Sequence, residues 1–128
     1  MSLRDKIKIL VVDDMAVSRG LLTQALDELS VNNYAYVSNG QEAVQYLAKT
    51  PVHLVISDYN MPQMDGLGLL KSMRSNPATA KTGFIMVTGS EDVSVIQKGA
   101  QLGMNNFLKK PFTATHLREC IEKVFGRL

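Results

Sequence analysis

The chain has 128 residues, 45% of them hydrophobic, and a formal net charge of +2 from 14 basic and 12 acidic side chains. This size and apolar content suit one domain that buries its own core without disulfide bonds. The small net charge gives no reason to expect a nucleic-acid partner, and no apolar run is long enough to span a membrane. The single cysteine, Cys120, suits a reducing compartment, so we expect a cytoplasmic protein.

In the first half of the chain, short apolar runs alternate with helical patterns. Residues 7–12 form a β-branched run closed by two aspartates, and residues 16–29 then place apolar side chains at helical spacing. Residues 34–37 return to β-favouring side chains. Asn39, with Glu42 three positions later, marks the start of a helix. The first half therefore predicts two strands, each followed by a helix.

The second half continues the alternation. Residues 52–57 form another buried-strand run that ends at Asp58, and Asp65 can cap the helix that follows it. Residues 84–88 predict a fourth strand, and a helix is expected from residue 91 to residue 102. Each of these strands is thus followed by a helix, which is the pattern of a parallel sheet.

The last strand and helix complete the pattern. Residues 106–109 predict a fifth strand, which Lys110-Pro111 ends because proline lacks a donor. Thr113 can cap a closing helix, whose inward face carries Leu117, Cys120, Ile121 and Val124. We expect five strands and five helices in one α/β domain over residues 1–128, with residues 1–6 as an N-terminal extension, native or partly left by cloning.

The chemistry-bearing residues lie at the carboxyl ends of the expected strands, where doubly wound sheets form their sites. They are Asp13 and Asp14 after the first strand, Asp58 after the third, Thr88 ending the fourth and Lys110 after the fifth. Three carboxylates in one pocket repel each other unless they are protonated, paired or metal-bound, and Mg²⁺ prefers such oxygen ligands. We therefore interpret Asp58 as a phosphate acceptor beside Mg²⁺, with Thr88 and Lys110 as donors to the phosphoryl oxygens.

These residues, from about residue 7 to residue 125, resemble the receiver domains of two-component response regulators. Residues 58–66 and 110–114 further resemble the single-domain, CheY-like chemotaxis type. The resemblance implies a flavodoxin-like (βα)5 fold with a five-stranded parallel sheet of strand order 2-1-3-4-5. It also implies that Asp58 accepts phosphate from a histidine kinase, and that the protein catalyses only its own Mg²⁺-dependent phosphorylation from a phosphodonor and its autodephosphorylation, without being an enzyme for a separate substrate.

The resemblance assigns roles residue by residue. The implied Mg²⁺ ligands are Asp13, Asp14, Asp58 and the backbone carbonyl of Asn60. Thr88 and Phe107 would form the switch that turns phosphorylation into a change of packing. Asn60 and Ser90 would border the path of an attacking water and so set the lifetime of the phosphate.

Because the chain ends just after the last helix, we expect a monomer without an output domain, which acts by binding another protein. By resemblance that partner is a flagellar motor switch protein. The alternative is a phosphorelay intermediate or phosphate sink that passes phosphate to a histidine phosphotransfer domain. A magnesium-dependent phosphatase would need an aspartate at the position of Asn60, and a mononucleotide binder would meet repulsion from Asp13 and Asp14.

Overall fold

The structure is a computed structural model that describes residues 2–89 and 93–128. The strands are β1 (Ile9–Val12), β2 (Tyr34–Val37), β3 (Leu54–Asp58), β4 (Gly83–Thr88) and β5 (Asn106–Lys109). The helices are α1 (Leu3–Lys6), α2 (Ala16–Glu28), α3 (Gly40–Lys49), α4 (Gly66–Ser75), α5 (Val93–Leu102) and α6 (Ala114–Phe125). All strand pairs are parallel and the sheet order is β2-β1-β3-β4-β5, which confirms the predicted doubly wound fold.

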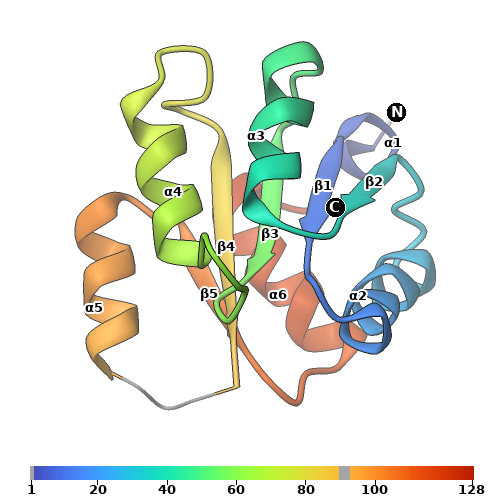
Figure 1. The fold of residues 1–128 in the computed structure, drawn as a ribbon. Helices are drawn as coiled ribbons and strands as arrows, with labels where there is room; N and C mark the ends of the chain where they lie inside the picture. The colour runs from blue at the N-terminus through green and yellow to red at the C-terminus, as the bar shows by residue number, and fades with distance from the viewer. Residues whose placement is uncertain (1, 90–92) are drawn as a thin grey trace.

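Helices cover both faces of the sheet, with α2 and α6 on one side and α3, α4 and α5 on the other (Figure 1). The central strands are buried on both faces, so their side chains divide between two cores. On β1, Ile9 and Val11 pack toward α2 and α6, whereas Leu10 and Val12 pack toward α3 and α4. This explains why the strands read as continuous apolar runs instead of alternating ones.

The predicted helix starts are confirmed by their caps. The side chain of Asn39 accepts a hydrogen bond from the Glu42 backbone at 2.8 Å, and that of Asp65 accepts one from the Gly68 backbone at 2.8 Å. Thr113 likewise accepts one from the His116 backbone, at 3.1 Å. Each cap satisfies an amide that the first helical turn leaves without an intrahelical partner.

The amino-terminal segment differs from the prediction. Residues 1–6 were expected as an N-terminal extension without a helix, whereas Leu3–Lys6 form the short helix α1, and Leu3 packs against the core. The first strand also begins at Ile9 instead of residue 7, because the Ile7 amide donates to the Leu3 carbonyl of α1. The structure thus has a sixth helix among the described residues, attached to the core through Leu3.

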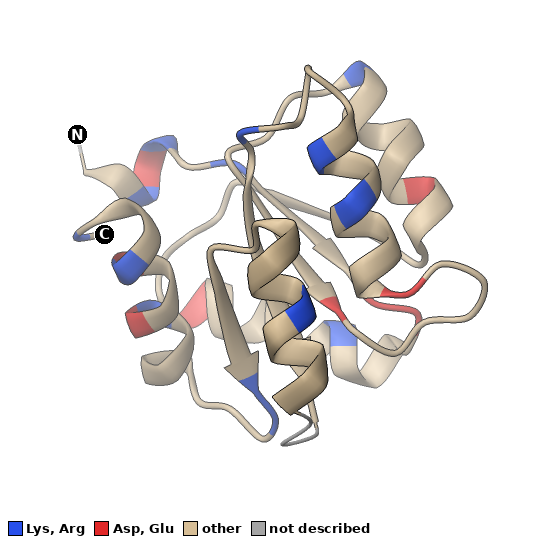
Figure 2. Ribbon diagram, turned by 90° about the vertical axis from the view of Figure 1, so that its left-hand side faces the viewer, with Lys and Arg blue, Asp and Glu red and all other residues tan. Residues whose placement is uncertain are grey.

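The surface agrees with a chain that carries little net charge. Figure 2 shows basic and acidic segments side by side on α6, the helix nearest the C-terminus. There the Arg118 Nε atom lies 3.9 Å from a Glu122 carboxylate oxygen. Within the parts of the chain that the structure describes, no helix has the length and apolar character needed to cross a bilayer.

Candidate functional site

The register of the sheet brings the predicted site residues together at the carboxyl ends of the strands. Val12 at the end of β1 pairs with Ser57 of β3, and Asp58 is the last residue of β3, one residue further than the sequence predicted for that strand. Thr88 at the end of β4 pairs with Lys109 of β5. Asp58 and the loops that carry Asp13, Asp14 and Lys110 therefore lie at the same end of the sheet.

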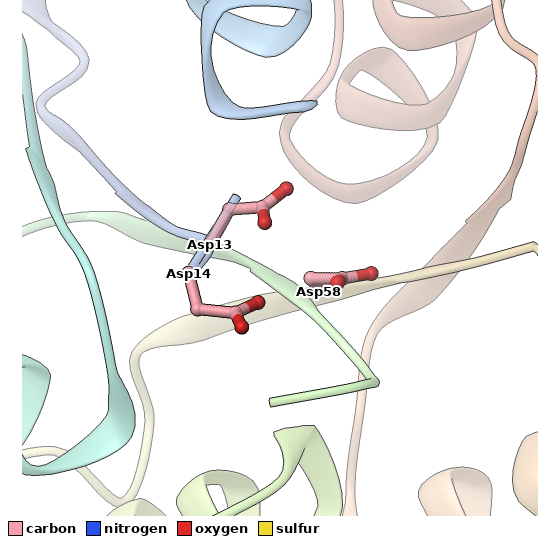
Figure 3. Close-up of side chains that lie close together, drawn as sticks. All are labelled: Asp13, Asp14 and Asp58. Carbon is pink, nitrogen blue, oxygen red and sulfur yellow. The ribbon is translucent and has the colours of Figure 1, made fainter. Parts of the chain in front are cut away.

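The three predicted metal-ligating carboxylates form one group. Asp13, Asp14 and Asp58 each offer an oxygen, and these oxygens all lie within 4.8 Å of one another. In Figure 3 the side chains of Asp13 and Asp14 extend toward that of Asp58. Asp13 and Asp58 are buried, so water screens the repulsion among these charges only in part.

Two oxygens of this group have no hydrogen-bond partner among the described residues. They are Asp13 Oδ2 and Asp14 Oδ1, and both are shielded from solvent. A buried carboxylate oxygen without a donor is costly, and a hard divalent cation that prefers carboxylate oxygens and water removes that cost. The donor set therefore fits Mg²⁺. Two or three carboxylates would hold the ion, without a nitrogen or sulfur ligand.

Lys110 is paired with the predicted acceptor. Its Nζ atom lies 3.1 Å from Asp58 Oδ1, with 29% of the lysine side chain and 7% of the aspartate side chain exposed. The Lys110 amide also donates to the Thr88 carbonyl at 2.8 Å, which fixes the residue beside the end of β4. The Lys110-Pro111 peptide bond is cis. Of the two adjacent lysines, the structure places the predicted one on Asp58.

Burial dominates the ionisation of Asp58. Desolvation raises the pKa of its carboxyl above the usual range, and the negative charge of Asp13 raises this pKa further. The hydrogen bond and the positive charge of Lys110 oppose the shift without cancelling it. The metal-free site thus holds a carboxylate whose charge is unfavourable in the folded protein.

This shift predicts a pH-dependent effect of Asp58→Asn on stability. Because the folded pKa of Asp58 lies above its unfolded value of about 3.9, the native state binds the proton more tightly, and ionisation lowers the free energy of unfolding as pH rises between the two values. Without Mg²⁺, the variant should gain stability over the wild type across this window, and the difference should level off above the folded pKa. Urea unfolding of both proteins from pH 4 upward measures it. A difference that does not vary with pH would contradict this account.

Sequence reasoning left Gly66 without a role, and the structure supplies one. A Cβ atom at this position would lie 2.8 Å from the Asp58 carbonyl oxygen, and the Gly66 amide donates to the Tyr59 carbonyl at 2.9 Å. The start of α4 can therefore pack directly under the acceptor only because residue 66 has no side chain. The sequence signal for this role was a glycine at the first position of a helix, directly after the capping residue.

Three predicted assignments concern Asn60, Phe107 and Ser90, and the geometry of the site does not test them. The side chain of Asn60 is exposed, and Phe107 on β5 is 38% exposed. Ser90 lies outside the described residues. The Mg²⁺-binding carbonyl and lifetime role of Asn60, the switch role of Phe107 and the lifetime role of Ser90 stay predictions.

Fold and site together define a doubly wound α/β protein with a lysine-paired aspartate in an acidic, metal-fitting group at the carboxyl ends of its strands. Residues 9–122 match the family model of the response regulator receiver domain. The chain belongs to this family, as its motifs predicted.

Known proteins similar to this chain carry chemotaxis names. The chain is 46% identical to a protein of Rhizobium etli described as "Probable chemotaxis protein CheY", over 100% of this chain and 99% of the relative. It is 36% identical to "Chemotaxis protein CheY-3" of Vibrio cholerae, over 98% of this chain and 97% of that protein.

Solved structures agree with the fold. The chemotaxis response regulator CheY4 of Vibrio cholerae superposes with a TM-score of 0.84 at 28% identity, covering 92% of this chain and 98% of that one. A response regulator receiver protein from Pseudomonas putida gives 0.82 at 31% identity, covering 91% and 96%. The predicted receiver fold is confirmed, and the chain is a response regulator.

Proposed function

We propose that this response regulator accepts a phosphoryl group on Asp58 from a histidine kinase and then signals by binding another protein. The observation that carries the proposal is the Asp58–Lys110 pair, set beside two buried carboxylate oxygens without donors. A nucleophile, a cation for the phosphoryl oxygens and a metal-fitting group thus lie close together at one site. We take residues 1–128 as one receiver domain of a cytoplasmic monomer.

In the proposed reaction, an Asp58 oxygen forms a bond to phosphorus while the phosphorus–nitrogen bond of a phosphohistidine breaks, and the leaving imidazole takes up a proton. Asp13 and Asp14, with Asp58 and the Asn60 carbonyl, would hold Mg²⁺. When bound, the ion would supply positive charge against the phosphoryl oxygens. Lys110 would move its ammonium group from the Asp58 oxygen to the phosphoryl group, because that group carries about −1.5 to −2 charge.

The proposed output surface consists of α5, β5 and α6. Val95 and Gly99 are buried, which turns the other side of α5 outward, and there Val93 is 61% exposed and Ala100 is exposed. Phe107 lies on β5, three residues before Lys110, so a shift of the lysine can reach the ring through one short segment. Movement of Thr88 toward the phosphoryl group would make room for that ring.

The chemotaxis names of the relatives support a flagellar motor switch protein as the partner. Transfer to a histidine phosphotransfer domain, as a relay or a phosphate sink, is the alternative. The two are separated by treating the protein with beryllofluoride, which mimics the acyl phosphate, and measuring its affinity for a switch-protein peptide. A motor regulator should bind the peptide more tightly after treatment. A relay or sink should show no such change and should phosphorylate the phosphotransfer domain.

The phosphodonor needs a docking surface next to Lys110. A groove of about 490 Å³ lies there between α2 and the loop after β5, lined mainly by apolar atoms of Leu21, Ala25, Pro111 and Phe112. Leu21 is 54% exposed, although large apolar side chains favour burial. Lys110 lines the groove and also contacts Asp58, so we propose that the histidine-bearing domain of the kinase binds there.

The groove predicts that Leu21→Glu slows phosphorylation by the kinase at least about tenfold, because a buried interface would have to desolvate the new carboxylate. Phosphorylation by acetyl phosphate should be unchanged, since this small donor needs no groove. Val93→Glu on α5 is the matched control, with the same kind of change on the proposed output surface. Equal loss with both donors would mean that Leu21 acts on the site itself.

A further inference from the structure

Arg19 on α2 joins three segments around the acidic group. Its Nη1 group donates to the Asp13 carbonyl oxygen at 2.9 Å and, at 3.4 Å, to the Ser38 hydroxyl after β2. Its guanidinium carbon lies 5.1 Å from the centre of the Tyr36 ring. The aromatic platform and the two acceptors hold the guanidinium in one place, as its planar fork allows.

The contact with Arg19 completes the anchoring of Asp13. The Asp13 amide donates to the Val37 carbonyl at 3.2 Å, and Asp13 Oδ1 accepts a hydrogen bond from the Met15 amide at 3.0 Å. With the carbonyl held by Arg19, Oδ2 is the remaining polar atom of the residue, and it has no donor among the described residues. The hydrogen bonds of the other polar groups of Asp13 thus orient Oδ2 toward the acidic group.

The same contact bears on Asp14. The Asp13 carbonyl belongs to the peptide group that joins Asp13 to Asp14, and this group is planar. A donor that holds the carbonyl therefore fixes the plane of this peptide group, and with it the position of the Asp14 backbone nitrogen and Cα atom. Asp14 Oδ1, the other buried oxygen without a donor, depends on that orientation.

We propose that Arg19 is a positioning residue that holds Asp13 and Asp14 ready for a divalent cation. This inference rests on the proposed function, in which the acidic group binds Mg²⁺. Arg19 acts through the backbone and touches neither metal nor phosphate. Residues in such supporting positions change metal affinity by about 10–100-fold when they are replaced.

The sign of the effect separates positioning from simple electrostatics. Arg19 carries a positive charge beside the site, and by charge alone its removal should tighten the binding of a cation. If Arg19 positions the ligands, its removal must instead weaken that binding. The two explanations therefore predict opposite changes in Mg²⁺ affinity.

The test is a calorimetric titration of the unphosphorylated protein with Mg²⁺ alone. Arg19→Gln should lower the affinity about tenfold. Arg19→Lys, which keeps one donor for the carbonyl but loses the fork and the stacking on Tyr36, should fall between it and the wild type. Arg118→Gln on α6 makes the same change of charge at an exposed position and should leave the affinity at the wild-type value.

Metal-free thermal unfolding of each variant shows whether it folds. An affinity in Arg19→Gln equal to or higher than that of the wild type overturns the inference. If Arg19→Gln does not fold, Arg19→Lys serves as the test. An Mg²⁺ affinity of Arg19→Lys equal to that of the wild type then also overturns the inference. If the wild type itself fails to bind Mg²⁺, the proposed function fails instead, so the two failures are distinguishable.

Discussion

Asp13→Asn should abolish Mg²⁺ binding and at the same time make the metal-free protein more stable. Asp13 is fully buried, and its carboxylate lies close to those of Asp14 and Asp58. Asparagine keeps an oxygen that can accept the hydrogen bond from the Met15 amide, so the change removes the charge with little change in shape. Two unit charges about 4 Å apart repel by about 1 kcal/mol even in water and more when buried, so a gain of at least about 1 kcal/mol is expected.

Urea unfolding with and without Mg²⁺ measures both effects. The wild type should be stabilised by the ion, because a ligand that binds only the folded state raises the free energy of unfolding. Asp13→Asn should have a higher free energy of unfolding than the wild type without Mg²⁺, and Mg²⁺ should not raise it further. Glu119→Gln, an exposed neutralisation on α6, is the control and should respond to Mg²⁺ like the wild type. Stabilisation of Asp13→Asn by Mg²⁺ to the wild-type extent would contradict the assigned ligand set.

Lys110→Ala should leave Asp58 phosphorylatable but uncouple it from the output surface. The lysine supplies the cation 3.1 Å from Asp58 Oδ1, and its amide ties it to the Thr88 carbonyl. Hydrogen bonds to charged groups contribute about 1.5–3 kcal/mol. Loss of this contact in the phosphorylated state should therefore reduce the gain in partner affinity at least about tenfold. Fluorescence anisotropy of a labelled partner peptide, with and without beryllofluoride, reports that gain.

Lys109→Ala is the matched control for this prediction. Lys109 is the neighbouring residue at the exposed end of β5, whereas Lys110 is the residue on Asp58. The control should keep the full affinity gain. A loss confined to Lys109→Ala, or an unchanged gain in Lys110→Ala, would contradict the coupling.

Much of the site could be predicted because topology does most of the positioning. Once Asp13, Asp58 and Lys110 were assigned to the ends of parallel strands, their meeting followed from the sheet order. Lys110 was chosen from its place before Pro111, and in the structure its Nζ atom lies 3.1 Å from Asp58 Oδ1. These predictions needed only the ends of elements, which the apolar runs and caps mark clearly.

The parts that sequence reasoning missed depend on tertiary contacts. Arg19 lies in a helical pattern, where an arginine usually indicates a solvated face, and only the fold shows that it reaches the Asp13 carbonyl. The role of Gly66 depends on how closely α4 approaches the end of β3. Helix α1 was missed because four residues carry no helical periodicity, although Leu3 is held by the core.

The most direct test of the central claim is to map the phosphoryl group after incubation with acetyl phosphate and Mg²⁺. The acyl phosphate is trapped by borohydride reduction, and the modified residue is located by peptide mass spectrometry. The wild type should carry a single modification, at Asp58, and chelation of Mg²⁺ or the Asp58→Asn substitution should remove it. Full labelling of Asp58→Asn, or modification of the wild type at another residue, would contradict the assignment of Asp58 as the acceptor.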